Sequence, residues 1–267
     1  MSAYCRLRGA ALQAQVAEWE DQPAMTVPLL IAVLLGGLAQ RATGMGLVLV
    51  SAPFIVVALG PASGVVVGNL LGLLASALVF VQTRQFVEWR MLWIMLPPAL
   101  VGVALGTLLA EQLPTAWAQI GIGVLLLGAM LASALVARGR HIERGPGITA
   151  VAGAASGMMA SLAGIGGPAM AVLRTLTRWE HVSFAATLQP FFIGASIVTV
   201  FARVGANPGA WPDLGWGWLA MVLAIVLGVA LGDEVTRRLS ARTIGMAINT
   251  VAALGAVWTM LDGLAAL

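Results

Sequence analysis

Apolar residues dominate the chain from residue 26 onward, and short polar or glycine-rich stretches interrupt them. A helix needs about 20 apolar residues to cross the roughly 30 Å of hydrocarbon in a bilayer. The pattern predicts six segments of that length, which are 62–82, 89–111, 115–137, 181–203, 214–235 and 241–265. It also predicts four short segments, which are 26–40, 45–60, 146–162 and 167–177. The expected fold class is therefore an all-α polytopic membrane protein.

The composition supports this expectation, since 60% of the 267 residues are hydrophobic, 9% are charged, and the mean hydropathy is +0.96. A soluble protein could not cover so much apolar surface, because its exterior needs polar groups. The lone cysteine, Cys5, excludes a disulfide framework and a cysteine-based metal site. All 14 basic side chains are arginines scattered between apolar segments, which favours anchoring at lipid headgroups and argues against nucleic acid as a partner.

The chain contains an internal repeat. Glycine and amide positions match at an offset of 120 residues, namely Gly44 with Gly164, Gly46 with Gly166, and Asn69 with Gln189. The motif Gly102–Gly106 recurs as Gly228–Gly232, and a loop at 204–213 accommodates the six extra residues of that offset. The common order and the near-constant offset together indicate two repeats.

The repeat divides the chain into four parts. Residues 1–25 are expected to form an extramembrane N-terminal segment, 26–137 the first transmembrane repeat, 138–145 a cytoplasmic linker, and 146–267 the second repeat. Each repeat comprises one pair of short helices, broken or re-entrant, followed by three full transmembrane helices. Because three is an odd number, the repeats have opposite orientations, a common plan of secondary transporters.

The arginines orient the chain in the membrane. One set of loops carries most of them, which are Arg84, Arg90, Arg138, Arg140, Arg144, Arg174, Arg178, Arg237, Arg238 and Arg242. The opposite side carries Arg6, Arg8 and Arg203, and Arg41 belongs to neither set. The positive-inside rule places the larger set in the cytoplasm and both termini outside.

The two short pairs are the most informative feature. Half-length helices joined by glycine leave backbone groups unpaired at membrane depth, which is tolerable only beside protein or a water-filled cavity. Their connections, 41–46 and 161–168, are expected to meet at the midplane and to form a substrate site. The helix after each connection would point its N-terminus inward, where free N–H groups favour an anion. The alternative is that these glycines only permit close helix packing.

Arg41 lies at the first connection, beside Gln40, Thr43 and Gly44, with no acidic residue near it in sequence. A charge within the membrane usually faces a cavity or a partner, and a guanidinium suits an oxyanion such as a sulfonate. The alternative is that the first pair spans fully, which would make Arg41 an ordinary cytoplasmic arginine.

Polar residues in mid-span supply further candidates. Asn69, Thr187 and Gln189 are expected either to line the cavity or to form interhelical hydrogen bonds. The sequence shows no carboxylate relay, metal-ligand spacing or nucleotide-binding loop. Ser161 is the only tempting nucleophile, and neither histidine is placed to activate it, so an enzyme and a cofactor are not expected.

The order of these motifs resembles that of a known family, the sulfite exporters of the TauE/SafE type. The first half carries Gln40-Arg41-Ala42-Thr43-Gly44-Met45-Gly46, Ser51-Ala52-Pro53-Phe54, Gly68-Asn69-Leu70-Leu71-Gly72 and Val87-Glu88-Trp89-Arg90. The second half carries Ala163-Gly164-Ile165-Gly166-Gly167-Pro168-Ala169 and Phe184-Ala185-Ala186-Thr187-Leu188-Gln189-Pro190. The similarity covers about residues 26–265, and it departs where members often carry three consecutive glycines and this chain has Gly44-Met45-Gly46. The resemblance implies transport of small sulfur-containing anions across the bacterial inner membrane.

The sequence thus predicts a secondary transporter or facilitator that moves sulfite or an organosulfonate by alternating access, with a passive anion channel of the same fold as the alternative. The predicted substrate-binding residues are Gln40, Arg41, Thr43, Gly44, Gly46, Asn69, Gly164, Ile165, Gly166, Gly167, Pro168, Thr187 and Gln189. The expected partners are a small anionic substrate and the lipid bilayer, and the sequence leaves a homodimer open.

Overall fold

The computed structural model describes residues 23–136, 141–212, 214–238 and 241–266, and within these ranges it contains helices and no strand. Residues 1–22 of the predicted N-terminal segment lie outside the described residues, and so do residues 138–140 of the predicted linker. The α-helices are α2 (Pro23–Thr43), α3 (Gly46–Thr83), α4 (Trp89–Ala110), α5 (Thr115–Val136), α6 (Pro146–Ala163), α7 (Gly167–Thr177), α8 (His181–Ala206), α9 (Gly217–Arg238) and α10 (Ala241–Ala265). Two 3-10 turns, η1 (Arg84–Phe86) and η2 (Pro208–Ala210), lie between them.

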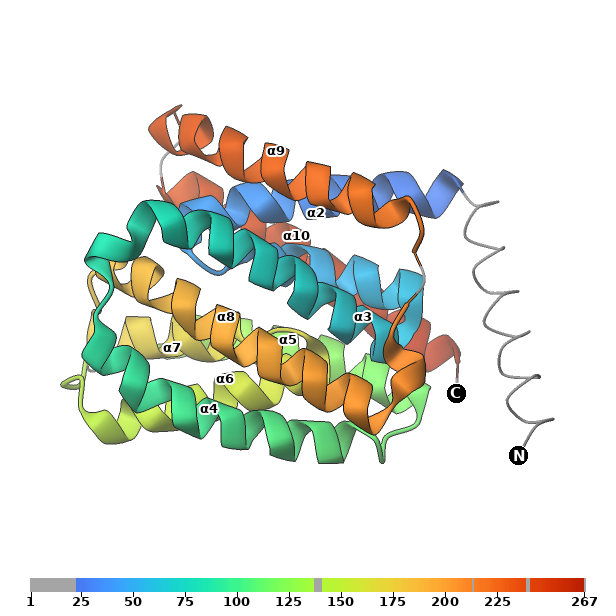
Figure 1. The fold of residues 1–267 in the computed structure, drawn as a ribbon, viewed down its shortest axis with the longest axis horizontal. Helices are drawn as coiled ribbons and strands as arrows, with labels where there is room; N and C mark the ends of the chain where they lie inside the picture. The colour runs from blue at the N-terminus through green and yellow to red at the C-terminus, as the bar shows by residue number, and fades with distance from the viewer. Residues whose placement is uncertain (1–22, 137–140, 213, 239–240, 267) are drawn as a thin grey trace.

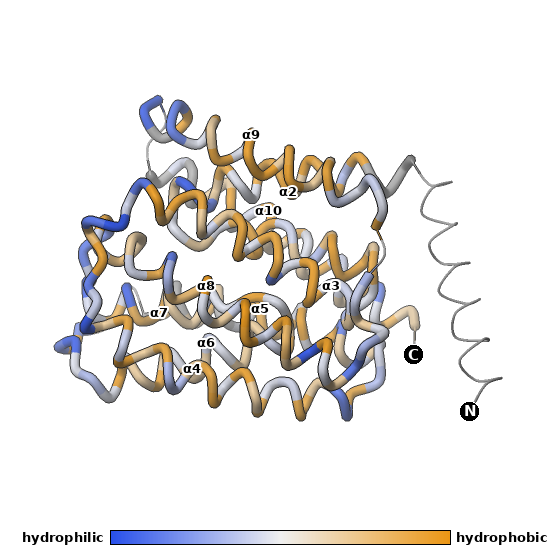
Figure 2. The backbone as a smooth tube through the Cα atoms, in the orientation of Figure 1, coloured by the Kyte–Doolittle hydropathy of each residue, from blue (hydrophilic) through white to orange (hydrophobic). Residues whose placement is uncertain are grey.

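The helices run lengthwise along one common direction, and hydrophobic residues occupy their middles while hydrophilic residues gather at their ends (Figures 1 and 2). Among the residues that the structure describes, seven helices are long and apolar enough to cross a membrane. Large apolar side chains such as Phe201 and Trp93 are exposed at 76% and 65%. An exterior of this kind suits hydrocarbon, so the prediction of a polytopic α-helical membrane protein is confirmed.

The lengths of the predicted short helices differ from expectation. Segment 146–162 was expected to be short, but α6 has 18 residues and is long and apolar enough to span a membrane. α2 has 21 residues, because the helix continues beyond residue 40 through Thr43. The short members are the part of α3 that precedes Gly60 and the 11-residue α7. Gly60, at φ 74° and ψ 166°, breaks α3 where the sequence predicts a boundary between two segments.

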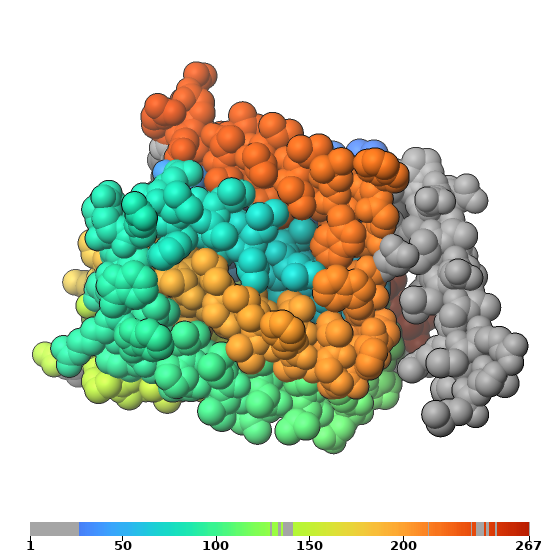
Figure 3. Space-filling view, viewed as in Figure 1, coloured from blue at the N-terminus to red at the C-terminus, as the bar shows by residue number. Residues whose placement is uncertain are grey.

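The tertiary contacts pair helices from the two predicted halves. α2 packs along α9, α6 along α4, α3 against α8, and α5 against α10. Small residues allow the closest of these contacts, since a Cβ on Gly102 or Gly157 of α4 and α6 would collide with the facing backbone. Side chains of α3, α4, α8 and α9 cover the face shown in Figure 3. The first helix of each half, α2 or α6, thus packs along a helix of the other half. This arrangement fits an inverted repeat, and the opposite orientations of the two halves stay a prediction.

Candidate functional site

Two glycines in a left-handed conformation end the helices that lead into the site. Gly44, at φ 83°, separates α2 from α3, and Gly164, at φ 72°, separates α6 from α7. Glycine adopts this conformation without the steric cost of a Cβ, and it commonly ends a helix in this way. The two breaks lie against each other, because a Cβ on Gly167 would lie 3.3 Å from the carbonyl oxygen of Met45. The predicted connections are therefore in contact.

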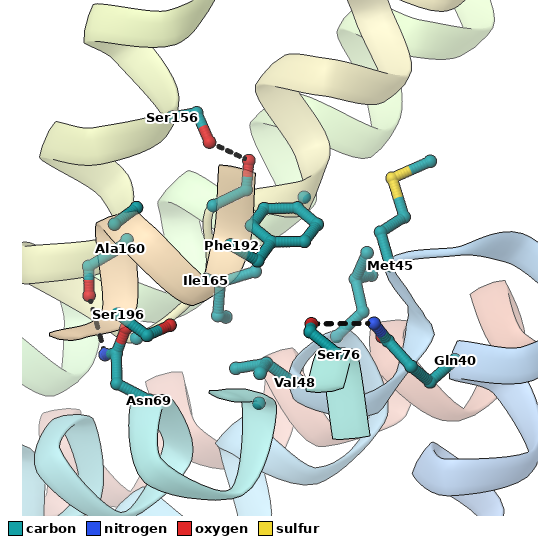
Figure 4. A pocket seen from close by; sticks show the side chains of 16 residues that line it. Gln40, Met45, Val48, Asn69, Ser76, Ser156, Ala160, Ile165, Phe192 and Ser196 are labelled. Atoms are coloured by element: carbon teal, nitrogen blue, oxygen red, sulfur yellow. Dashed lines mark hydrogen bonds between the residues drawn. The ribbon is translucent and has the colours of Figure 1, made fainter. Parts of the chain in front are cut away.

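A cavity lies between the two breaks (Figure 4), and its atom-free space of about 460 Å³ includes a part that opens to the surroundings. Its lining has polar groups but no charged side chain. The lining residues are Gln40, Met45, Val48, Leu49, Asn69, Gly72, Ser76, Ser156, Ala160, Gly164, Ile165, Gly166, Gly167, Phe192, Ala195 and Ser196.

A buried amide network holds the first break. The Nε2 of Gln40, which carries two hydrogens, lies within hydrogen-bond distance of three acceptors, the Gly44 carbonyl, the Ser76 hydroxyl and the Gln189 Oε1, at 3.2, 3.2 and 3.1 Å. The Nε2 of Gln189 donates to the Gly44 carbonyl at 3.0 Å and to the Ala185 carbonyl at 2.6 Å. Both glutamines are buried, so these bonds fix the break against α8 without competition from water.

Asn69 performs the corresponding task at the second break. Its Nδ2 donates to the Val65 carbonyl within α3 at 2.8 Å and to the Ala160 carbonyl of α6 at 3.2 Å. Asn69 and Gln189, which match in the repeat, thus each donate to a carbonyl four residues earlier in their own helix. Each also donates to a carbonyl next to the break of the other half, and Asn69 additionally lines the cavity.

The first turn of α7 brings backbone donors to the cavity. Gly166 is the N-cap of α7 and makes no side-chain cap hydrogen bond, and Gly167 is the first helical residue. Pro168, the second helical residue, has no N–H, but the other N–H groups of this first turn, such as that of Gly167, have no partner within the helix and carry the positive end of its dipole. At the first break, by contrast, the Gln40 side chain caps α3, since its Oε1 accepts from Leu47 N at 3.2 Å. The cavity can therefore offer neutral hydrogen-bond donors to an anion.

The sulfite exporter TauE/SafE family model matches residues 29–259, which is most of the chain. The protein belongs to the TauE/SafE sulfite exporter family. No curated protein and no solved structure matches it. Membership agrees with the seven apolar helices and indicates a multi-pass membrane transporter, with sulfur-containing anions as the substrates that the family name indicates.

The sequence-predicted site residues of this TauE/SafE protein fall into two groups. Those that line the cavity are Gln40, Asn69, Gly164, Ile165, Gly166 and Gly167. Those outside the lining are Arg41, Thr43, Gly44, Gly46, Pro168, Thr187 and Gln189. Gly44 and Gln189 adjoin the cavity through the amide network, and Gly46 packs on Ala39 of α2. Thr43 donates to the Ala39 carbonyl at 2.9 Å, and Pro168 is buried in the first turn of α7.

Arg41 has an acidic partner that its sequence neighbourhood does not reveal. Its Nη2 lies 2.6 Å from the Oδ1 of Asp233 on α9. No acidic residue lies near Arg41 in sequence, but α9 packs along α2 and supplies Asp233, so the binding role predicted for Arg41 stays a prediction. This ion pair directs the guanidinium to the contact between α2 and α9, where both side chains are partly exposed.

Three serines that line the cavity were missed by the sequence reasoning. Ser76, Ser156 and Ser196 are all buried, and the Ser156 hydroxyl donates to the Gly166 carbonyl at 2.7 Å. Ser76 and Ser196 stand 120 residues apart in sequence, the same offset as the glycines of the two breaks. That offset is the signal that could have found them.

Polar contacts join the predicted halves at both ends of α4 in this exporter family member, and Arg144 of the predicted linker takes part at one end. Before α4, Glu88 accepts from Arg144 at 3.3 and 2.8 Å and from the Trp179 indole at 2.7 Å, while Arg144 stacks over Trp179. The backbone N–H of Glu88 donates to the Thr187 hydroxyl at 2.9 Å, so Thr187 belongs to this cluster. Beyond the other end of α4, Arg203 pairs with Glu111 at 2.8 Å.

The Ser161 hydroxyl lies 2.7 Å from the hydroxyl of Thr107, which makes it a packing contact between α4 and α6. No group of three or more metal-ligating side chains occurs in the part of the chain that the structure describes. One carboxyl outside the spans is perturbed, since hydrogen bonds from the backbone N–H groups of Val182 and Ser183 lower the pKa of Glu180, the N-cap of α8.

Proposed function

We propose that the protein moves a small sulfur-containing oxyanion, either sulfite or an organosulfonate, across the bacterial inner membrane. The observation that carries the proposal is a cavity between the two helix breaks of a TauE/SafE family member. Broken helices at matching positions of two repeats are a recurrent place for transporter substrate sites. The uncapped first turn of α7 supports an anion as the ligand.

We propose further that the cavity opens alternately to the two sides as one repeat rocks against the other. The hydrogen bond of Glu88 with the Trp179 indole and the ion pair of Glu111 with Arg203 connect the predicted halves at opposite ends of α4, so each can hold one end closed. Rocking would break one contact while it preserves the other. In this proposal both termini lie outside the cytoplasm, as the distribution of arginines predicts.

Uptake by proteoliposomes tests the proposal. The purified protein is reconstituted, and uptake of labelled sulfite and of labelled alkanesulfonates is followed against protein-free vesicles. Saturable uptake that depends on the protein is the expected result. A correctly folded, reconstituted protein that moves none of these anions contradicts the proposal. A variant with Gln189→Leu, which removes the hydrogen bonds of Gln189 with the Gly44 carbonyl and with Gln40, is expected to lose most of the uptake.

A further inference from the structure

The charge of the cavity lining restricts which anions it can hold. No lining residue is charged, and the adjacent Arg41 is paired with Asp233. An anion in this cavity would therefore be held by neutral groups alone. The cost of taking an ion out of water grows with the square of its charge, so neutral donors offset that cost more readily for a single charge than for a double charge.

The cavity has hydroxyl donors that are not used by the protein. Ser196 is only 6% exposed and lines the cavity. Within the described residues its hydroxyl has no hydrogen-bond partner (Figure 4). Ser76 accepts from Gln40 through its Oγ, and its own hydroxyl hydrogen is not donated to any described residue. Together with the first N–H groups of α7, these hydroxyls supply donors for the oxygens of one anion.

Asn69 adds an acceptor to the same cavity. An amide nitrogen has two hydrogens, and the two on Asn69 Nδ2 are directed at the Val65 and Ala160 carbonyls. This arrangement leaves the Oδ1 on the other side of the amide group, and no described residue donates to it. Asn69 is 3% exposed and lines the cavity, and its Oδ1 is not among the enclosed polar atoms of the described residues that lack a partner, so this oxygen is accessible from the cavity. A ligand with its own O–H or N–H group would satisfy it.

We infer that this site selects singly charged sulfur oxyanions that carry a hydrogen-bond donor, such as hydrogensulfite or a hydroxyalkanesulfonate. The inference rests on the proposed function and specifies its substrate class. The sulfonate or sulfite oxygens accept from Ser196, Ser76 and the first turn of α7. The donor of the ligand is directed at the Oδ1 of Asn69.

Three probes that share a two-carbon skeleton test the inference. Binding of ethanesulfonate, 2-hydroxyethanesulfonate and ethane-1,2-disulfonate is titrated by thermal stabilisation of the full-length protein in detergent. We expect 2-hydroxyethanesulfonate to bind roughly 3- to 10-fold more tightly than ethanesulfonate, because one added hydrogen bond strengthens binding by about that factor. We expect the disulfonate to bind at least about 10-fold more weakly than ethanesulfonate, because its second charge would leave water without gaining a charged partner.

Two serine variants distinguish the loss of a donor to the ligand from a general loss of protein stability. Ser196→Ala removes an unpaired hydroxyl from the cavity, and it is expected to weaken every singly charged probe about 10-fold, as loss of a hydrogen bond to a charged group predicts. Ser51→Ala is the matched control, because Ser51 is a buried serine of α3 outside the cavity lining, whose hydroxyl donates to the Leu47 carbonyl at 2.8 Å. It is expected to leave probe binding unchanged.

The outcomes distinguish this inference from the proposed function. Equal binding of ethanesulfonate and the disulfonate overturns selection by charge, and equal binding of the two monosulfonates overturns the role of Asn69. Unchanged binding by Ser196→Ala overturns the role of that hydroxyl. In each of these cases, transport of sulfite or a sulfonate leaves the proposed function standing. A folded protein that neither binds nor transports any sulfur oxyanion overturns both.

Discussion

Replacement of Gly44 by alanine probes the geometry of the first break. Gly44 has a φ of 83°, and a Cβ there would lie 2.8 Å from both the Cα and the Cβ of Ala185 on α8. A left-handed conformation costs alanine about 1–2 kcal/mol. Overpacking against a neighbouring helix adds about 1–3 kcal/mol, because the closest atoms include backbone. The expected loss of unfolding free energy is therefore about 2–5 kcal/mol.

Gly164→Ala is the matched control at the second break. Gly164 has a similar φ of 72°, but its Cβ would lie 3.5 Å from the Cα of Val65, an ordinary van der Waals distance. Only the conformational cost of about 1–2 kcal/mol is expected. Thermal unfolding of both variants in detergent measures the difference, at roughly 2–4 °C for each kcal/mol. If Gly44→Ala and Gly164→Ala lower the Tm equally, the contact between the first break and α8 is not what requires Gly44.

Three further predictions concern the charged groups and the topology. If Arg41 serves mainly to pair with Asp233, the double variant Arg41→Gln/Asp233→Asn transports better than Arg41→Gln alone, because it also removes the negative charge that Arg41 balances; equal loss in both variants would indicate direct contact of Arg41 with substrate. Glu88→Gln and Glu111→Gln, at opposite ends of α4, are expected to change the ratio of the KM values for influx and efflux in opposite directions, and a change in the same direction refutes their role as alternate closures. Cys5 is the single cysteine, so a membrane-impermeant maleimide is expected to label it from outside in intact cells, whereas labelling only after lysis would reverse the predicted orientation.

Helix positions were predictable because apolar length and glycine punctuation are local signals. Segment 167–177 coincides with α7, and the boundary after residue 60 coincides with the break of α3. The length of α2 was not predictable in the same way. The polar side chains at its end, Gln40 and Arg41, have partners that are distant in sequence, and a hydropathy pattern cannot identify such partners.

The site was predictable in outline and not in its detailed contacts. The glycines of both breaks and Asn69 were identified because the repeat duplicates them. The structure places Asn69 and the glycines of the second break in the cavity lining, whereas Gly44 and Gly46 lie outside it. Ser196 was missed because a single serine in an apolar helix has no periodicity, although its repeat mate Ser76 stands at the same offset. Thr187 was expected near the substrate, but its hydroxyl accepts a hydrogen bond from the backbone N–H of Glu88, just before α4.

Counterflow is the measurement that tests the central claim most directly. Proteoliposomes are loaded with a high concentration of unlabelled sulfite or alkanesulfonate and diluted into a trace of the labelled anion. A transporter that exposes one cavity alternately to the two sides accumulates label transiently above its equilibrium level, and this overshoot is the predicted result. Protein-dependent flux that is linear in concentration and shows no overshoot would contradict alternating access and identify a passive channel.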